Sequence, residues 1–485
     1  MALPAADIVS KLPETPPPSG VTSRQWRGVL ALVLVVYACV QFFYITATPL
    51  QTVTLPDNMP NRSTESIVVG RGPDESEHFL YILSLAENGA LPMPDPAHRT
   101  SPQQYVTYQA QHPPLFYALA ALVYKAASGL PPAALWYLLR ALCAVCGGVT
   151  LVLTAWAARL SFPQRPFFAL APAPAVAFLP MFGYMNANLS NEPLEMVFGA
   201  AVWLQLVRLA RERTPYTVAS IALLGVTFGL AALTRLTALL WLPAILLILW
   251  HCARRVPGPQ RAAPLLTGAG GFLLLLAPWL AYNRATFGSL LVRSYHRPLI
   301  AGITLNHFLH SPRFSPYLML TALWDSSTGW CPFWLTQFGL PGGGPNAALL
   351  WQALFLLLNI FLLLALLWNA RQARRSGEVR DLVGSLLVWA AFCAVAFCVL
   401  VLFQQSVFVD WQVMNYGGRY LAASAPAGTL LLLAACAAWV RPSLRSAKVA
   451  AGLLAVVLLG FDAYTVVLIQ QFYQARPSRP SVRRL

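Results

Sequence analysis

Long apolar runs, separated by short polar segments, extend along almost the whole chain. A helix needs about 20 mostly apolar residues to cross the hydrocarbon core of a membrane, and about eleven runs reach roughly that length. They lie near 27–45, 136–158, 166–184, 194–210, 216–233, 236–252, 264–282, 347–368, 382–403, 421–440 and 449–468. The pattern therefore predicts an all-α polytopic membrane protein with about eleven transmembrane helices.

Basic residues gather in the short segments between alternate runs, and this asymmetry predicts the orientation. The N-terminus is expected in the cytoplasm, where most short loops then carry Arg or Lys. Residues 1–25, which contain PETPPPSG, are predicted to be a disordered cytoplasmic tail. Residues 26–470 are expected to form the transmembrane domain, and 471–485 a basic tail. The side of that tail depends on whether the last run crosses.

Two long polar segments, 46–113 and 283–346, fall on the extracytoplasmic side in this orientation. The first contains a helical pattern that opens near Pro73 and ends at Asn88-Gly89, a common C-cap sequence. The stretch 114–127 (PLFYALAALVYKAA) is too short to cross comfortably. We expect both to be amphipathic juxtamembrane helices at the end of the bundle.

Composition supports the membrane assignment and excludes other classes. Of 485 residues, 57% are hydrophobic and 10% are charged, which argues against a soluble enzyme. The net charge is +16, but the 33 basic residues are scattered between apolar runs. Because no basic patch is interleaved with aromatic residues, no nucleic-acid partner is expected. The positive charge is interpreted as loops that face anionic membrane lipid.

The scarce carboxylates are concentrated in the first outer loop. On the predicted helix, Asp74, Glu77 and His78 share one face, while Glu75 points about 100° away. Such a cluster at the membrane surface suits a general base or a divalent-cation site. The alternative is plain N-capping of a surface helix. Seven of the 17 acidic residues lie in this loop: Asp57, Glu65, Asp74, Glu75, Glu77, Glu87 and Asp95.

Further polar side chains recur at the outer ends of the apolar runs. Ionisable groups there cost energy unless they are paired or hydrated, so each is a functional candidate. For the arginines, the alternative is snorkelling to lipid headgroups. Together, carboxylates, amides and arginines on one face suit an anionic ligand, because the guanidinium matches phosphate geometry. The candidates are His112 (QHPPLFY), Asn188 and Glu192 (NANLSNEP), Arg235 (LTRLT), and Asn415, Arg419 and Tyr420 (NYGGRY).

These motifs, in this order, resemble the glycosyltransferase C superfamily, which includes the protein O-mannosyltransferases and the lipid A aminoarabinose transferase. The segments that carry the likeness are DESEH, HPPLFY, SNEP, LTRLTALLWLP, NRATFGSLL, FWLTQFGL and NYGGRYLAASAP, within about 27–440. The last motifs are similar to those of an uncharacterised bacterial branch of predicted membrane glycosyltransferases. Two positions depart from the family pattern: Glu192 stands where Asp is frequent, and Gly417-Gly418 where Gln-Gly is usual.

The resemblance implies an inverting glycosyltransferase of the bacterial inner membrane, with an extracytoplasmic active site. It would move a sugar from a polyprenyl-phosphate donor to an acceptor that could be a protein, a lipid or a glycan. Asp74 would be the base, and Glu75 would orient the acceptor or, with Asp74, hold a divalent cation, Mg²⁺ or Mn²⁺. Arg235 and Arg419 would neutralise the leaving phosphate. The other expected substrate contacts are Glu77, His78, His112, Asn188, Glu192, Asn415 and Tyr420.

Two other function classes stay open. A transporter or flippase of lipid-linked sugars would need polar groups at the bilayer midplane and discontinuous helices. The apolar runs look uninterrupted, which argues against that class. A non-catalytic membrane scaffold would fill the outer groove with its own side chains, and the retained DE, HPPL and GRY motifs argue against it.

Overall fold

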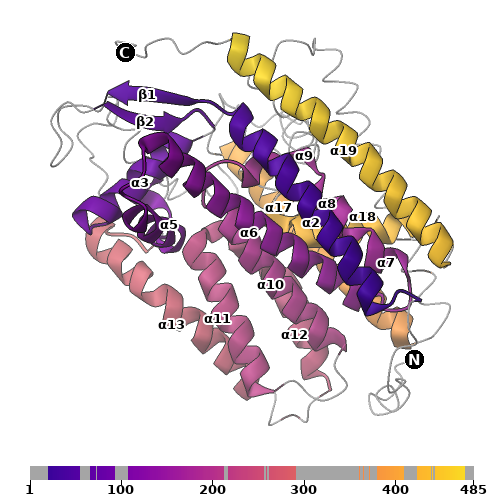
Figure 1. Ribbon diagram of the computed structural model, residues 1–485. Coiled ribbons are helices and arrows are strands. Elements are labelled where there is room, and N and C mark those ends of the chain that lie inside the picture. Colours follow the sequence, from indigo (N-terminus) through magenta and orange to yellow (C-terminus); the bar gives the residue numbers. More distant parts are fainter. Residues whose placement is uncertain are drawn as a thin grey trace.

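The computed structural model describes residues 20–54, 66–92 except Pro73, 108–211, 217–255, 262–290, 379–408, 423–437 and 443–475, with a few isolated positions between them. The long helices stand side by side in a row, in the order α13, α11, α10, α6, α2 and α19 (Figure 1). Their bounds are Ala262–Phe287, Val218–Thr234, Glu192–Arg211, Pro132–Ser161, Ser23–Ala47 and Leu444–Ala475. A second layer packs against α10 and consists of α12 (Leu242–Ala253), α17 (Val379–Phe408) and α18 (Ala425–Cys436).

The expected polytopic helical fold is confirmed. Among the described residues, six helical segments are long and apolar enough to cross a membrane: Ser23–Ala47, Pro132–Ser161, Glu192–Arg211, Leu236–Ala253, Leu265–Phe287 and Leu444–Gln471. The shorter apolar helices include α11 and parts of α17 and α18. Large apolar side chains such as Leu32, Phe42 and Val456 are exposed on the outer faces, as expected for a lipid-facing surface. The apolar run expected near 347–368 lies almost wholly outside the described residues.

One stretch differs from the uninterrupted run that the sequence predicts. Residues 166–184 do not form a single helix, but three short ones in succession. Pro172 and Pro180 each stand in the first turn of a new helix, where the missing amide hydrogen costs nothing but the preceding helix must end. The segments are α7 (Phe167–Leu170), α8 (Pro172–Ala177) and α9 (Pro180–Asn186). The path through this part of the bundle is therefore discontinuous.

A small cap covers one end of the row of helices. It contains an antiparallel hairpin of β1 (Leu50–Thr54) and β2 (Ser66–Gly70), in which Leu50 pairs with Gly70. It also contains the two helices predicted in the first outer loop, α3 (Glu75–Asn88) and α5 (Leu115–Ala126). As predicted, α3 ends at Asn88, and Gly89 follows in the left-handed conformation. Phe79, Phe116 and Trp136 of α3, α5 and α6 pack together and hold the cap on the bundle.

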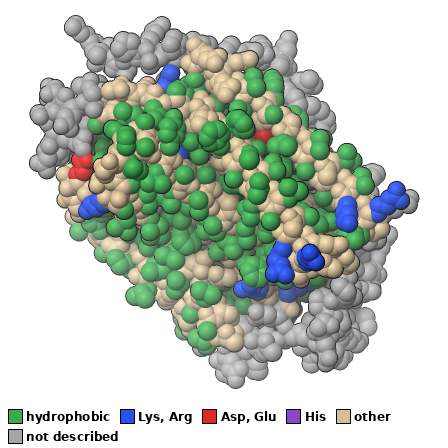
Figure 2. All heavy atoms as spheres, viewed as in Figure 1, with side chains coloured by type: hydrophobic (Ala, Val, Ile, Leu, Met, Phe, Trp, Pro, Cys, Tyr) green, Lys and Arg blue, Asp and Glu red, His purple; other side chains and the backbone are tan. Residues whose placement is uncertain are grey.

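Arginines gather at the opposite end of the bundle, where α2 begins (Figure 2). There, Thr22 and Gln25 form a capping box that starts α2. Three arginines predicted for the cytoplasmic loops lie over tryptophan rings near this end, in the pairs Arg159–Trp26, Arg208–Trp156 and Arg254–Trp250. These three arginine–tryptophan pairs and the cap therefore lie at opposite ends of the bundle.

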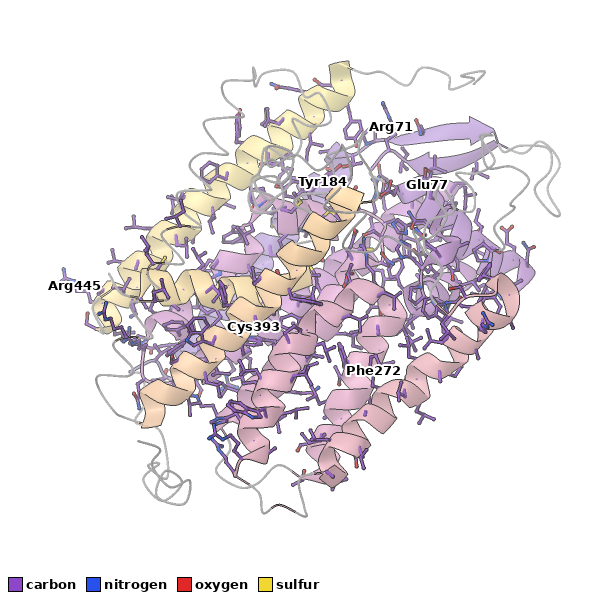
Figure 3. The ribbon with its side chains drawn as sticks, turned by 180° about the vertical axis from the view of Figure 1, so that it is seen from behind. Arg71, Glu77, Tyr184, Phe272, Cys393 and Arg445 are labelled. Atoms are coloured by element: carbon purple, nitrogen blue, oxygen red, sulfur yellow. The ribbon has the colours of Figure 1, made fainter. Side chains whose placement is uncertain are left out.

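The last helix, α19, runs from the basic end to the cap. Near its beginning, Ala447 packs in a cluster that also contains Val21, just ahead of α2. Near its end, the Tyr473 hydroxyl donates to the carbonyl oxygen of Arg71 beside the hairpin, at 2.7 Å. Figure 3 shows Arg445 and Arg71 at opposite ends of this helix. The last apolar run is thus long enough to cross, and the chain leaves it on the side of the cap.

Close contact between α11 and α13 gives a test of the packing. A Cβ atom added at Gly225 would lie 2.0 Å from the carbonyl oxygen of Gly268, so backbone would have to move. Small residues at such helix interfaces let backbones approach in a membrane. We expect Gly225→Ala to destabilise the protein by about 1–3 kcal/mol, the usual cost of overpacking. Thermal unfolding in detergent, followed by tryptophan fluorescence, should show a lower midpoint.

The matched control is Gly270→Ala on α13, where an added Cβ meets nothing within 4 Å. Its midpoint should equal or exceed that of the wild type, because alanine favours helix. Equal midpoints for the two variants would contradict the close packing of α11 on α13.

Candidate active site

A buried ion pair joins the cap to the bundle. Both carboxylate oxygens of Glu75 face Arg140 of α6, at 2.9 Å from Nε to Oε1 and 2.6 Å from Nη2 to Oε2. Both side chains are 0% exposed. The amide of Leu189 donates to Oε1 and that of Gly72 to Oε2, each at 2.8 Å. The carboxylate therefore accepts four hydrogen bonds, which offsets much of the cost of burying its charge.

The same arginine also fixes the end of α2. Its Nη1 donates to the carbonyl oxygens of Ile45 at 3.0 Å and of Thr48 at 2.7 Å. Two glycines leave room for these side chains and their neighbour Asn188. An added Cβ at Gly70 would lie 2.0 Å from Glu75 Oε2, and one at Gly72 would lie 2.3 Å from Asn188 Oδ1. The GRG sequence before the acidic cluster is thus explained by close approach of backbone to buried charge.

Asp74 precedes α3 in an unusual backbone conformation. Its φ is 56° and its ψ is 12°, and among the described residues it is the one non-glycine residue with positive φ. Aspartate tolerates this left-handed region better than most residues, but at some cost in free energy. The Asp74 side chain occupies the N-cap position yet makes no capping hydrogen bond. Plain N-capping, the alternative explanation for this residue, therefore does not account for it.

Two histidines and two tyrosines form a stacked group beside Asp74. His78 Nδ1 lies 2.8 Å from the hydroxyl oxygen of Tyr117. The ring of Tyr81 stacks on that of Tyr117 at 3.8 Å, and the His78 and His112 rings are 6.4 Å apart. Tyr81 also donates to the carbonyl oxygen of His112 at 3.2 Å. The predicted site residues His78 and His112 are thus brought together through α3 and α5.

Tyr117 links this group to the remaining charges. Burial raises the pKa of its hydroxyl well above the usual value of 10, and the carboxylates of Glu192 and Asp74 raise it further, whereas Arg235 lowers it. The phenol therefore stays protonated at neutral pH. The charges of Asp74, Glu192 and Arg235 therefore all act on this one hydroxyl.

Arg235 stands in a break between helices. It follows the last residue of α11 and precedes the 3-10 helix η3 (Leu236–Trp241). Its guanidinium forms an ion pair with Glu192 and lies 4.0 Å from the carboxylate of Glu195. All three side chains are at least nine-tenths buried. Two carboxylates from α10 thus orient one buried arginine, which is not the geometry of a side chain that snorkels to lipid headgroups.

Buried amides lie between the two ion pairs. Asn188 donates to the carbonyl oxygen of Tyr184 at 2.6 Å, and Asn191 donates to that of Thr234 at 3.2 Å. The Oδ1 atoms of both side chains are buried with no hydrogen-bond partner in the structure. Buried acceptors of this kind are rare, and they fit a water molecule or a ligand hydroxyl.

The remaining predicted site residues are placed less centrally or are not described. Glu77 accepts a hydrogen bond from the neighbouring Ser76 at 2.9 Å and is half-buried near the start of α3 (Figure 3). Asn415, Arg419 and Tyr420 lie outside the described residues. The structure thus brings together Asp74, Glu75, His78, His112, Asn188, Glu192 and Arg235 at the cap end of the bundle.

Sequence analysis missed Arg140, Tyr117 and Asp462. Asp462 is 1% exposed in the middle of α19 and accepts a hydrogen bond from the Tyr44 hydroxyl at 2.7 Å. A charged residue inside an apolar run is a strong signal, and Arg140 and Asp462 both gave it. Tyr117 lies in the HPPLFY motif, but an aromatic residue in an apolar helix carries no signal of its own.

Loss of Arg140 should leave a buried carboxylate without its cation. We expect Arg140→Leu to destabilise the protein by about 3–5 kcal/mol, as for other buried pairs broken on one side. The double variant Glu75→Leu/Arg140→Leu should lose much less stability than the sum of the losses in the two single variants. Denaturant unfolding in detergent measures both effects, and additive losses would contradict the coupling. Arg159→Leu, at the opposite end of the bundle, is the control and should cost about 1 kcal/mol or less.

Comparisons with known proteins agree with this geometry at the level of fold. No protein-family model matches the sequence, and no curated protein sequence matches it either. Among solved structures, ArnT from Cupriavidus metallidurans bound to undecaprenyl phosphate is similar, with a TM-score of 0.52 and 15% identity over 93% of this chain and 78% of that one. The archaeal oligosaccharyltransferase AglB from Archaeoglobus fulgidus gives 0.46 and 16% over 91% of this chain and 55% of that one. The chain therefore shares the fold of ArnT, in line with the polytopic helical architecture predicted from the sequence.

Proposed function

We propose that this protein is an inverting membrane glycosyltransferase that moves a sugar from a polyprenyl-phosphate donor to an acceptor. Asp74 carries the proposal, because its backbone is strained, its side chain makes no capping hydrogen bond, and its charge acts on the same Tyr117 hydroxyl as that of the buried Arg235. Strained backbone of this kind clusters at functional sites. The fold shared with a structure that holds undecaprenyl phosphate supports a lipid-phosphate donor.

In the proposed reaction, an acceptor hydroxyl or amine attacks the anomeric carbon of the sugar. The Asp74 carboxylate takes the acceptor proton as the new bond forms. The bond between the anomeric carbon and the phosphate oxygen breaks on the opposite side, so the configuration inverts and the lipid phosphate leaves with the bonding electrons. Arg235 stabilises the charge that develops on that phosphate, and its orientation by Glu192 reduces the reorganisation that this requires.

Other polar groups are given supporting roles. His78, hydrogen-bonded to the protonated Tyr117, and His112 beside it would contact the acceptor or the phosphate. The unpartnered Oδ1 atom of Asn188 would accept a hydrogen bond from a sugar hydroxyl. Arg419, Asn415 and Tyr420 stay predictions from the sequence.

Glu75 has a different role from the one that the resemblance suggests. Its two oxygens already accept four hydrogen bonds, so we assign it to positioning Asp74, not to the acceptor or to a metal. Among the described residues, no group of three or more His, Cys, Asp or Glu side chains could hold a metal ion. Mg²⁺ or Mn²⁺ therefore stays a prediction in which Asp74 would be the carboxylate ligand, and no step above depends on it.

The membrane setting of the reaction is part of this proposal. With the basic end in the cytoplasm, as the positive-inside rule predicts, the cap and Asp74 would lie on the extracytoplasmic side of a bacterial inner membrane. A polyprenyl chain would lie against the exposed apolar faces of the helices, with its phosphate at the level of Arg235. The acceptor, whether protein, lipid or glycan, would approach from the cap side.

A transporter of lipid-linked sugars is the second candidate function. Two observations favour it: the discontinuous path α7–α9, and the buried Asp462 in the middle of α19. Both are features of transporter folds. Movement of a labelled undecaprenyl-phosphate sugar across vesicles that contain the purified protein, with no sugar transferred, would establish this function in place of the transferase.

Asp74→Asn tests the proposed base. The amide cannot accept the acceptor proton, so the rate of sugar transfer should fall about a hundredfold or more. Purified protein is given a panel of undecaprenyl-phosphate sugars and a membrane extract as the source of acceptor, and released undecaprenyl phosphate is measured. The thermal unfolding midpoint should stay close to that of the wild type.

Glu87→Gln is the matched control on the same helix. Glu87 lies near the far end of α3, where Tyr124 donates to it at 3.2 Å, and this variant should keep its activity. Full activity of Asp74→Asn would remove Asp74 as the base.

A further inference from the structure

The C-terminal helix α19 contacts the loop that leads into Asp74. The Tyr473 hydroxyl donates to the Arg71 carbonyl oxygen at 2.7 Å, and the Arg71 guanidinium lies over the Tyr473 ring at 5.1 Å from its centroid. Tyr184 of α9 forms a hydrogen bond with the same tyrosine hydroxyl. Figure 3 shows Arg71 and Tyr184 close together at the cap end. The Tyr473 hydroxyl thus contacts two residues, Arg71 and Tyr184, that each lie more than 280 positions before it in the sequence.

The placement of Tyr473 is fixed lower down in the membrane. Asp462 accepts the hydrogen bond from Tyr44 of α2 and is eleven residues before Tyr473. Eleven residues are about three turns of helix and about 16 Å, so both side chains project from one face of α19. Val466 and Ile469, on the same face, are buried, whereas Val456 and Tyr464 are exposed. Two polar contacts therefore set both the height and the rotation of α19.

These contacts matter because helices in lipid gain little from burying apolar surface against each other. Much of α19 faces outward, with Leu453 63% and Val456 70% exposed. Apolar packing alone would therefore leave the rotation of α19 about its axis, and its position along that axis, weakly determined. A hydrogen bond at each of two heights removes that freedom, and α19 becomes a fixed support for the backbone at Arg71.

Two backbone contacts also hold this loop. The Arg71 amide donates to the carbonyl oxygen of Pro49 at 3.1 Å, and the Gly72 amide donates to Glu75 at 2.8 Å. With Tyr473 on the Arg71 carbonyl, the backbone ahead of Asp74 is held from α2, α3 and α19. A strained residue such as Asp74 persists only where its surroundings over-determine its conformation.

We propose that Tyr473 is a positioning residue. Through the Arg71 carbonyl, it keeps Asp74 in its left-handed conformation and so keeps the Asp74 carboxylate in place. The catalytic part of this inference rests on the proposed function, whereas the conformational part does not. The interaction is a hydrogen bond from a neutral phenol. Burial raises the pKa of Tyr473 above its usual value of 10, so the phenol is protonated at neutral pH.

Tyr473→Phe removes the hydroxyl and keeps the ring over Arg71. In hydrogen–deuterium exchange of the full-length protein in detergent, the peptide covering residues 66–79 should exchange faster than in the wild type, while peptides from α10 should not change. In the transfer assay, kcat should fall about tenfold and KM should change less than twofold, as expected when a reacting group is misplaced and not removed.

Two further variants make the result specific. Tyr464→Phe changes an exposed tyrosine on the same helix and should match the wild type in both measurements. Arg71→Ala removes the guanidinium but keeps the backbone carbonyl, so exchange over residues 66–79 should change less than in Tyr473→Phe.

Unchanged exchange in Tyr473→Phe would overturn the positioning role, whatever happens to activity. Faster exchange in Tyr473→Phe with full transfer activity would overturn its catalytic part. If the wild type transfers no sugar from any donor, the proposed function fails, and the exchange result still decides whether Tyr473 holds the loop.

Discussion

The buried ion pair between Glu75 and Arg140 is the interaction on which the rest of the site depends. It joins α2, α3, α6 and the segment before α10 at one point from which water is excluded. Each charge alone would be very costly in this environment, so the four segments are stable in this arrangement only together. The cap is therefore not a loose loop, but a part of the bundle that is held by a buried ion pair.

The same constraint bears on the neighbouring carboxylate, that of Asp74. Glu75 turns inward as the first residue of α3, and Asp74 before it must then adopt a left-handed conformation to connect to the hairpin. The two adjacent acids therefore differ in environment: Glu75 is buried and accepts four hydrogen bonds, whereas Asp74 is half-buried and makes no capping hydrogen bond.

The fold and half of the site could be predicted from the sequence, and the reasons for the remainder are physical. Apolar runs gave the spans, and Asn88-Gly89 gave the end of α3, because both signals are local. The sequence did not predict that Glu75 is buried in an ion pair while Asp74 is not, since this depends on Arg140, 65 residues away. The broken path α7–α9 was signalled by its prolines but outweighed by hydropathy, which averages over such interruptions.

Polar residues inside apolar runs are a more informative signal than hydropathy, because they determine how the helices of this molecule pack. A membrane supplies little driving force for specific helix packing, so position has to be set by close backbone contact, as between α11 and α13, or by buried hydrogen bonds. Arg140 does the latter beside the cap, between α6 and the end of α2, and Asp462 does so in the middle of α19, through Tyr44 of α2. Two of the buried charged residues, Arg140 and Asp462, therefore hold α3 and α19, the helices that contact the residues just ahead of Asp74.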